Sequence, residues 1–159
     1  MKLSKSEREV LILYLNELLA SEQVQKMKTY IQHGNTSTYT HSLVVAYYSY
    51  LFALRLPLRY DVQSIVRGAM LHDFYLYDWH IRAQSQRLHG FVHPKIALKN
   101  AHQYFRLNPI EEDIIAKHMW PLNILMPPRF RESMLICLVD KICSFAEIFH
   151  IPLYQRVLE

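Results

Sequence analysis

Glycine is scarce in this chain, and that scarcity limits the folds open to it. Only Gly34, Gly68 and Gly90 occur among 159 residues. Glycine makes the tight turns of hairpin-rich sheets and the backbone of phosphate-binding loops. The sequence therefore excludes a dinucleotide-binding fingerprint, a Gly-rich phosphate loop and a hairpin-rich β fold.

The length and the composition predict one globular domain. A chain of 159 residues suffices for a single domain with a real core. Hydrophobic residues make up 51% and charged residues 20%, which excludes an intrinsically disordered chain. No apolar run approaches the ~18–20 residues that span a bilayer. The first eight residues are polar and charged, unlike a signal peptide. We therefore expect a soluble, cytoplasmic protein.

Hydrophobic residues recur at helical spacing along most of the sequence. A Ser-x-x-Glu capping box, Ser4 with Glu7 or Ser6 with Glu9, predicts the first helix start. The predicted helices cover residues 4–20 (extended or restarted over 22–32), 39–54, 61–73, 94–106, 108–118 and 129–149. No segment convincingly predicts a strand. We expect an all-α fold, a single-domain bundle of about six helices over residues 1–159.

The charges indicate small anionic ligands more than nucleic acid. Lys and Arg outnumber Asp and Glu by 18 to 14, a formal net charge of +4. These charges are interspersed, whereas nucleic-acid surfaces cluster their basic residues. The nine histidines are more informative, because imidazole is the commonest metal ligand and the usual acid–base group near neutral pH.

Histidine and aspartate residues are distributed over five of the predicted helices. Asp140 lies in the apolar run Met134 to Cys143, where a carboxylate is either paired or bound to a metal. His72 and Asp73 end another apolar helix, and a cation would offset the cost of burying them. Helical bundles build metal sites by converging such side chains in their interior. The candidate ligands are His41, His72, Asp73, His93, His118 and Asp140.

The order of these residues resembles the HD-domain superfamily of metal-dependent phosphohydrolases. The matching segments are His41, Leu71-His72-Asp73, His93-Pro94, Ile115-Ala116-Lys117-His118 and Val139-Asp140-Lys141, spread over about residues 38–147. The resemblance implies that His41, His72, Asp73 and Asp140 hold one metal. It implies that His93 and His118 hold a second, with Asp73 as a bridge. From the residues alone, His93 and His118 could instead be capping or substrate-contacting side chains.

The resemblance also implies a reaction. Histidine and carboxylate ligands without thiolate suit Fe, Mn, Co, Ni or Zn. We expect hydrolysis of a phosphomonoester or phosphodiester, nucleotides included, by a hydroxide held by one or two divalent ions, with Asp73 as the catalytic residue. The partner is then a small phosphorylated substrate, not a membrane or a nucleic acid. The oligomeric state stays open, a dimer included.

One position departs from the family pattern. Several members carry Lys or Glu three residues after the His-Asp aspartate, where this chain has Leu76. His80, His89, Lys117 and Lys141 are candidates for the missing substrate contact, with Asp78 as a further one. For each of them a solvated surface position is the competing interpretation. Two other functions fit the same ligands: an HD-type di-iron oxygenase, and a non-catalytic nucleotide-binding or sensor module.

Overall fold

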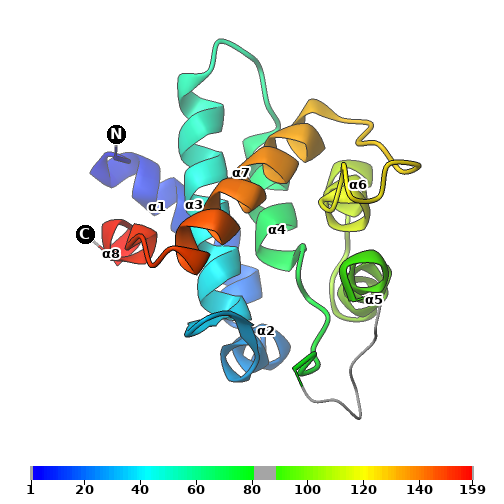
Figure 1. Ribbon diagram of the computed structural model, residues 1–159. Helices are drawn as coiled ribbons and strands as arrows, with labels where there is room; N and C mark the ends of the chain where they lie inside the picture. Colours follow the sequence, from blue (N-terminus) through cyan, green and yellow to red (C-terminus); the bar gives the residue numbers. More distant parts are fainter. Residues whose placement is uncertain (1, 81–88, 159) are drawn as a thin grey trace.

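The computed structural model describes residues 2–80 and 89–158, and these are mostly helical (Figure 1). The all-α prediction is confirmed. No helix within the described ranges is long and apolar enough to cross a membrane. The elements in order are α1 (Lys5–Leu19), α2 (Glu22–Lys26), the 3-10 turn η1 (Met27–Thr29), β1 (Ile31–His33), β2 (Thr36–Ser37), α3 (Thr38–Arg55), α4 (Val62–Leu71), α5 (His89–Tyr104), α6 (Pro109–Lys117), α7 (Arg131–Ile148) and α8 (Leu153–Leu158).

Helix starts follow the polar caps of the sequence. The Ser4 hydroxyl accepts a hydrogen bond from the Glu7 backbone N–H, and the Glu7 carboxylate accepts one from the Ser4 N–H. Ser37 and Asp61 cap α3 and α4 through their side chains. Asn108 caps α6 in the same way, with Pro109 following. Each cap satisfies backbone N–H groups that the first helical turn leaves free, so these starts are fixed locally.

Three local predictions are wrong. The helix expected to reach Gln32 ends earlier, and residues 31–37 form a small antiparallel hairpin around Gly34, whose φ of +54° suits glycine. α5 begins at His89, five residues before the expected start, so Pro94 lies inside the helix. The predicted tail forms α8 instead.

The helices pack so that candidate ligands that are far apart in sequence come from neighbouring elements. α3 lies against α4, and α7 crosses both of them (Figure 1). α6 packs on α4, α5 and α7. One apolar core lies between α1, α3, α4 and α5, and a second between α3, α4, α6 and α7. This arrangement brings the start of α3, the end of α4, the end of α6 and the middle of α7 to one place.

Candidate metal centre

His72 and Asp73 lie where α4 ends. The last helical residue is Leu71, and His72 is the C-cap. Neighbours on a regular helix diverge by about 100°. Because the helix stops here, both side chains turn toward the same centre, and both are buried. The prediction that the helix ends at this dyad is therefore confirmed.

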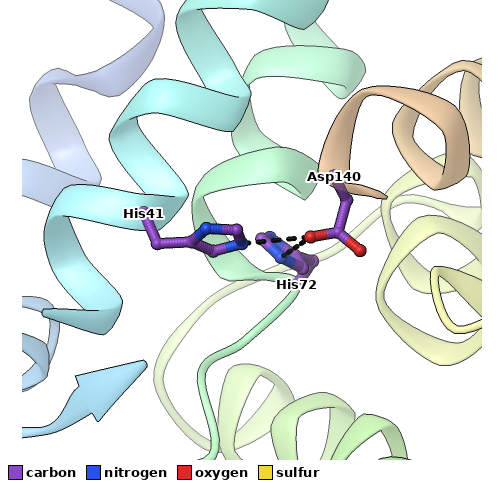
Figure 2. Close-up of side chains that lie close together, drawn as sticks. All are labelled: His41, His72 and Asp140. Atoms are coloured by element: carbon purple, nitrogen blue, oxygen red, sulfur yellow. Dashed lines mark hydrogen bonds and ion pairs between the residues drawn. The ribbon is translucent and has the colours of Figure 1, made fainter. Parts of the chain in front are cut away.

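The first group of ligands surrounds the dyad. His41 Nε2 lies 3.0 Å from Asp140 Oδ1 and 3.8 Å from Asp73 Oδ2. His72 Nε2 lies 3.6 Å from Asp140 Oδ1 and 3.2 Å from Asp73 Oδ2. Figure 2 shows His41 and His72 directed at the same Asp140 oxygen from two helices. Two nitrogens and two carboxylate oxygens thus form a compact set.

The second group lies on the other oxygen of Asp73. His93 Nε2 is 3.0 Å and His118 Nε2 is 3.5 Å from Asp73 Oδ1. The two imidazole nitrogens are only 2.8 Å apart. The His72 nitrogen also lies within 4.8 Å of the Asp73 and His118 donors, so the two groups adjoin. Asp73 therefore directs one oxygen to each group.

These donors fit divalent metal ions. Ligands ~2.1 Å from a common ion lie ~3.0 Å apart at right angles and ~3.4 Å apart at the tetrahedral angle. The separations of 3.0–3.8 Å in the first group and 2.8–3.5 Å in the second are close to those values. His72 Nε2 and Asp73 Oδ1 are buried and make no hydrogen bond of acceptable geometry with the described residues. A buried polar atom without such a bond is costly unless a cation satisfies it.

The outward nitrogens of three imidazoles are held by other groups. His72 Nδ1 lies 2.7 Å from the Ala69 carbonyl, and His118 Nδ1 lies 2.9 Å from the Ile115 carbonyl. A carbonyl only accepts, so Nδ1 donates, and Nε2 is the nitrogen that carries a lone pair toward the centre when the ring is neutral. His41 Nδ1 contacts both Glu147 oxygens at 3.0 Å. Partners of this kind orient metal-binding histidines.

Asp73 is held in place by a chain of hydrogen bonds that runs through Gln32. Gln32 Nε2 donates to Asp73 Oδ2 at 2.6 Å. The Tyr75 hydroxyl donates to Gln32 Oε1 at 2.6 Å, and the Thr38 hydroxyl does so at 3.3 Å. The β1–β2 hairpin carries Gln32 to this position. The hydroxyl groups of Tyr75 and Thr38 hold the oxygen of the Gln32 amide, so the amide nitrogen faces the Asp73 carboxylate.

The turn after the dyad completes this arrangement. Leu76 has a φ of +57°, in the left-handed region that a leucine rarely adopts. Asn100 of α5 donates to the carbonyls of Phe74 and Tyr75, both at 3.0 Å. The chain therefore reverses after the dyad, and the Tyr75 hydroxyl reaches Gln32.

The charges of the centre favour cations. Burial raises the pKa of Asp73, but His72, His118 and His93 outweigh it and hold that pKa well below its usual range. Burial also raises the pKa of Asp140, but the nearby His41 and His72 outweigh it and lower that pKa. Both carboxylates therefore stay ionised at neutral pH.

The histidines respond in opposite directions. Burial lowers the pKa of His41, yet its bonds to Asp140 and Glu147 raise it to about 9. The pKa of His118 is lowered, first by burial and also by the nearby His72 and His93. In this centre the imidazole beside Asp140, that of His41, therefore holds a proton more readily than the imidazole of His118.

A cavity of about 280 Å³ opens beside the second group. Its lining includes Asp73, His93, His118, Asp140 and Lys141. Trp79, Met119 and Ser144 also line it. The volume approaches the lower end of the range for small-molecule sites, ~300–1,000 Å³. A small ligand in this cavity would touch donors of both groups.

The four candidate substrate contacts are placed differently. Lys141 lines the cavity, and its Nζ donates to the carbonyls of His118 (2.9 Å) and Cys137 (3.2 Å). Lys117 instead pairs with Asp113 at 2.6 Å, apart from the cavity lining. His80 is exposed and lies 3.3 Å from Asp78. His89 begins α5, but its side chain lies outside the described part of the structure.

Sequence reasoning missed two residues of the centre. Glu147 lies seven residues after Asp140, two turns along the same helix, so the spacing alone could have placed it on the same face. Gln32 carried no such signal, because the sequence predicted a helix there and not a hairpin.

No protein-family model matches this chain, and neither does any curated protein or solved structure.

Proposed function

We propose that this protein is an HD-type, metal-dependent phosphohydrolase. The observation that carries the proposal is Asp73, whose two oxygens each face a separate group of imidazoles. A carboxylate placed in this way suits a bridging ligand between two cations. The sequence order of the six ligands, which resembles the HD-domain superfamily, supports the same interpretation.

The ligands divide between two ions. His41, His72, Asp140 and one oxygen of Asp73 would hold the first, and His93, His118 and the other oxygen of Asp73 the second. Imidazole and carboxylate donors without thiolate suit Fe, Mn, Co, Ni or Zn. When bound, such ions polarise a phosphoryl oxygen and make water a stronger nucleophile at neutral pH.

The chain itself contributes position and charge. Glu147 and Gln32 fix His41 and Asp73, so the ligands need little reorganisation when an ion binds. Lys141 lines the cavity, and its positive charge favours an anionic substrate there. The cavity admits a phosphate group beside Asp73. We propose a phosphomonoester or phosphodiester as the substrate class, nucleotides included.

The test is a panel of phosphomonoesters and phosphodiesters assayed with Mn²⁺, Fe²⁺, Co²⁺, Ni²⁺ and Zn²⁺. We expect phosphate or alcohol release with at least one ion. The Asp73→Ala variant should lose this turnover and its second ion but keep its helical circular dichroism. His102→Ala serves as the matched control, because that histidine is exposed and pairs with Glu112, outside the centre.

Three results would contradict the proposal. One is full turnover by the Asp73→Ala variant with unchanged metal content. Another is oxygen uptake by the iron-loaded protein without any phosphate release across the panel, which would assign the centre to a di-iron oxygenase. Binding of nucleotides without turnover would assign it to a sensor module.

A further inference from the structure

α7 is apolar around most of its circumference. Its inner side packs into the core through Leu135, Ile136, Val139, Cys143 and Ala146. Its opposite side carries six more large apolar residues, which we call the outer face: Met134, Leu138, Ile142, Phe145, Ile148 and Phe149. A helix that is apolar on all sides is normally buried on all sides. In Figure 1 no other described helix covers α7 from the viewer's side.

The outer face is large enough to form the apolar core of a protein interface. Its side chains are between 45% and 62% exposed. Together with the neighbouring Leu56 and Leu58, which are 41% and 54% exposed, they form a continuous apolar patch of several hundred Å². A standard interface buries about 800 Å² on each partner. Single exposed apolar residues are ordinary, but a continuous stripe of this size marks an interaction surface.

One end of the outer face contains a hollow. A cavity of about 490 Å³ lies between the N-terminal half of α7 and the loops before α4 and after α6. Met134 and Leu138 line it from α7, and Leu56, Leu58 and Trp120 line it from the loops. Arg131 and Lys141 also line it, but most of its exposed surface is apolar. The cavity therefore suits hydrocarbon or aromatic groups that need no hydrogen bonds.

The other end of the outer face carries a projection. Phe145 and Phe149 stack with ring centroids 4.4 Å apart and are 58% and 62% exposed. Phe145 follows Met134 by eleven residues, and Phe149 follows Leu138 by the same number. That separation is ~16 Å along a helix axis. The same surface thus holds a hollow and a projection at opposite ends.

We propose that the outer face pairs with the outer face of a second copy of this chain, with the two α7 helices antiparallel. A two-fold axis near Ile142 then places the Phe145 and Phe149 rings of each chain into the hollow of the other. Such self-complementarity is the requirement of a two-fold dimer, in which residue i contacts j and j contacts i. It favours a second copy over an unrelated partner.

The charges agree with this arrangement. Arg131 stands at the N-terminal end of α7 and faces the C-terminal end of the partner helix, whose free carbonyls carry partial negative charge. Lys141 comes close to the axis, but its Nζ bonds to the carbonyls of its own chain. Glu132 and Asp140, the nearest carboxylates of the helix, are buried on the inner side. No exposed acid of α7 therefore opposes the pairing.

The first experiment measures mass by sedimentation at low micromolar concentration. We expect twice the chain mass of 19.0 kDa. Leu138→Glu and Phe145→Glu should each raise the dissociation constant of the dimer at least ~100-fold, because each places a charge in an apolar interface. The matched control is Leu13→Glu, since Leu13 is 68% exposed on α1, and this variant should remain dimeric.

A second experiment tests the antiparallel arrangement by disulfide formation. Ile142→Cys, near the axis, should cross-link to itself on mild oxidation. Met134→Cys should cross-link to Phe149→Cys when the two variants are mixed, but not to itself. Both positions are exposed, so neither change is expected to unfold the chain.

Three outcomes would overturn the proposal. The first is a monomeric wild-type chain at tens of micromolar. The second is a dimer that the Leu138→Glu and Phe145→Glu changes leave intact, or one that cross-links through Met134→Cys alone. The third is a monomer that sediments with anionic phosphatidylglycerol vesicles, which would assign the outer face to a membrane surface.

Discussion

Single residues around the candidate centre act by holding its ligands. Glu147 contacts His41 with both oxygens, and Gln32 donates to Asp73. Neither is placed to bind an ion of either group directly. Their role is to orient the ligands, because they hold His41 and Asp73 with a ring nitrogen and a carboxylate oxygen directed at the centre.

Removing the charge at position 147 should weaken metal binding. We expect Glu147→Gln to lower the affinity of the first site ~10–100-fold, as loss of a ligand-orienting partner does. Titration of Mn²⁺ against a chelating indicator measures this affinity. Glu9→Gln, an exposed acid of α1, is the control and should bind like the wild type. Equal affinity in both variants would show that Glu147 does not orient His41.

The sequence predicted the six candidate ligands but not the residues that hold them. His72-Asp73 and Asp140 were recognisable because ionisable groups within apolar helices are unusual. Gln32 is an ordinary polar residue in sequence, and its importance appears only when the hairpin brings it to Asp73. Lys117 is the opposite case: the sequence made it a candidate substrate contact, but it pairs with Asp113, one helical turn away.

At the scale of helices, local signals were reliable and distant ones were not. Caps such as Ser37 and Asp61 act on the next three residues, so the starts of α3 and α4 could be predicted. The hairpin, the start of α5 and the short α8 depend on what they pack against. Such tertiary contacts leave no periodic pattern in so few residues.

Gly68 controls how closely α4 approaches α6. A Cβ at this position would lie 2.7 Å from Cδ1 and 3.1 Å from Cβ of Ile114. Alanine favours a helix over glycine, but here the overlap should prevail and Gly68→Ala should destabilise the fold by ~1–3 kcal/mol. Urea unfolding measures the change. Adding Ile114→Ala should cost less in Gly68→Ala than in the wild type. Increased stability of Gly68→Ala alone would contradict the close packing.

Glu7 links the start of α1 to α3. It accepts hydrogen bonds from Arg55 at 2.7 and 2.9 Å, and these, with the Ser4 backbone bond, lower the pKa of Glu7 from 4.5 to about 2. A lowered pKa in the folded state stabilises the fold above pH 4.5. That contribution is lost as the pH falls from 4.5 to 2.

This contribution should be visible in thermal unfolding. We expect Glu7→Gln to lower the melting temperature at pH 7 and to leave it nearly unchanged at pH 2. Melting curves by circular dichroism across this range, with Glu22→Gln as the exposed control, measure the difference. An equal drop in melting temperature at both pH values would mean that the ionised Glu7 carboxylate does not stabilise the fold.

At the scale of the whole molecule, the centre joins most of the bundle. Five helices each supply a candidate ligand or lie directly next to one: α3, α4, α5, α6 and α7. Ions bound there would cross-link elements that are far apart in sequence. Metal binding should therefore stabilise the fold as well as supply chemistry.

Metal binding should raise the melting temperature. At Mn²⁺ concentrations ~100 times the dissociation constant the gain is ~2.7 kcal/mol, and a chain of this size should melt ~5–10 °C higher. A chelator should reverse the shift. The Asp73→Ala variant should show little of it. An equal shift in that variant would locate the stabilising ion elsewhere.

The number of bound ions tests the central claim most directly. Elemental analysis of protein purified without added metal, and again after loading with Mn²⁺ and gel filtration, gives this number. We predict about two ions per chain for the wild type and about one for His93→Ala. A chain that retains no transition metal after loading, or a His93→Ala variant that retains as much as the wild type, would contradict a two-metal centre built around Asp73.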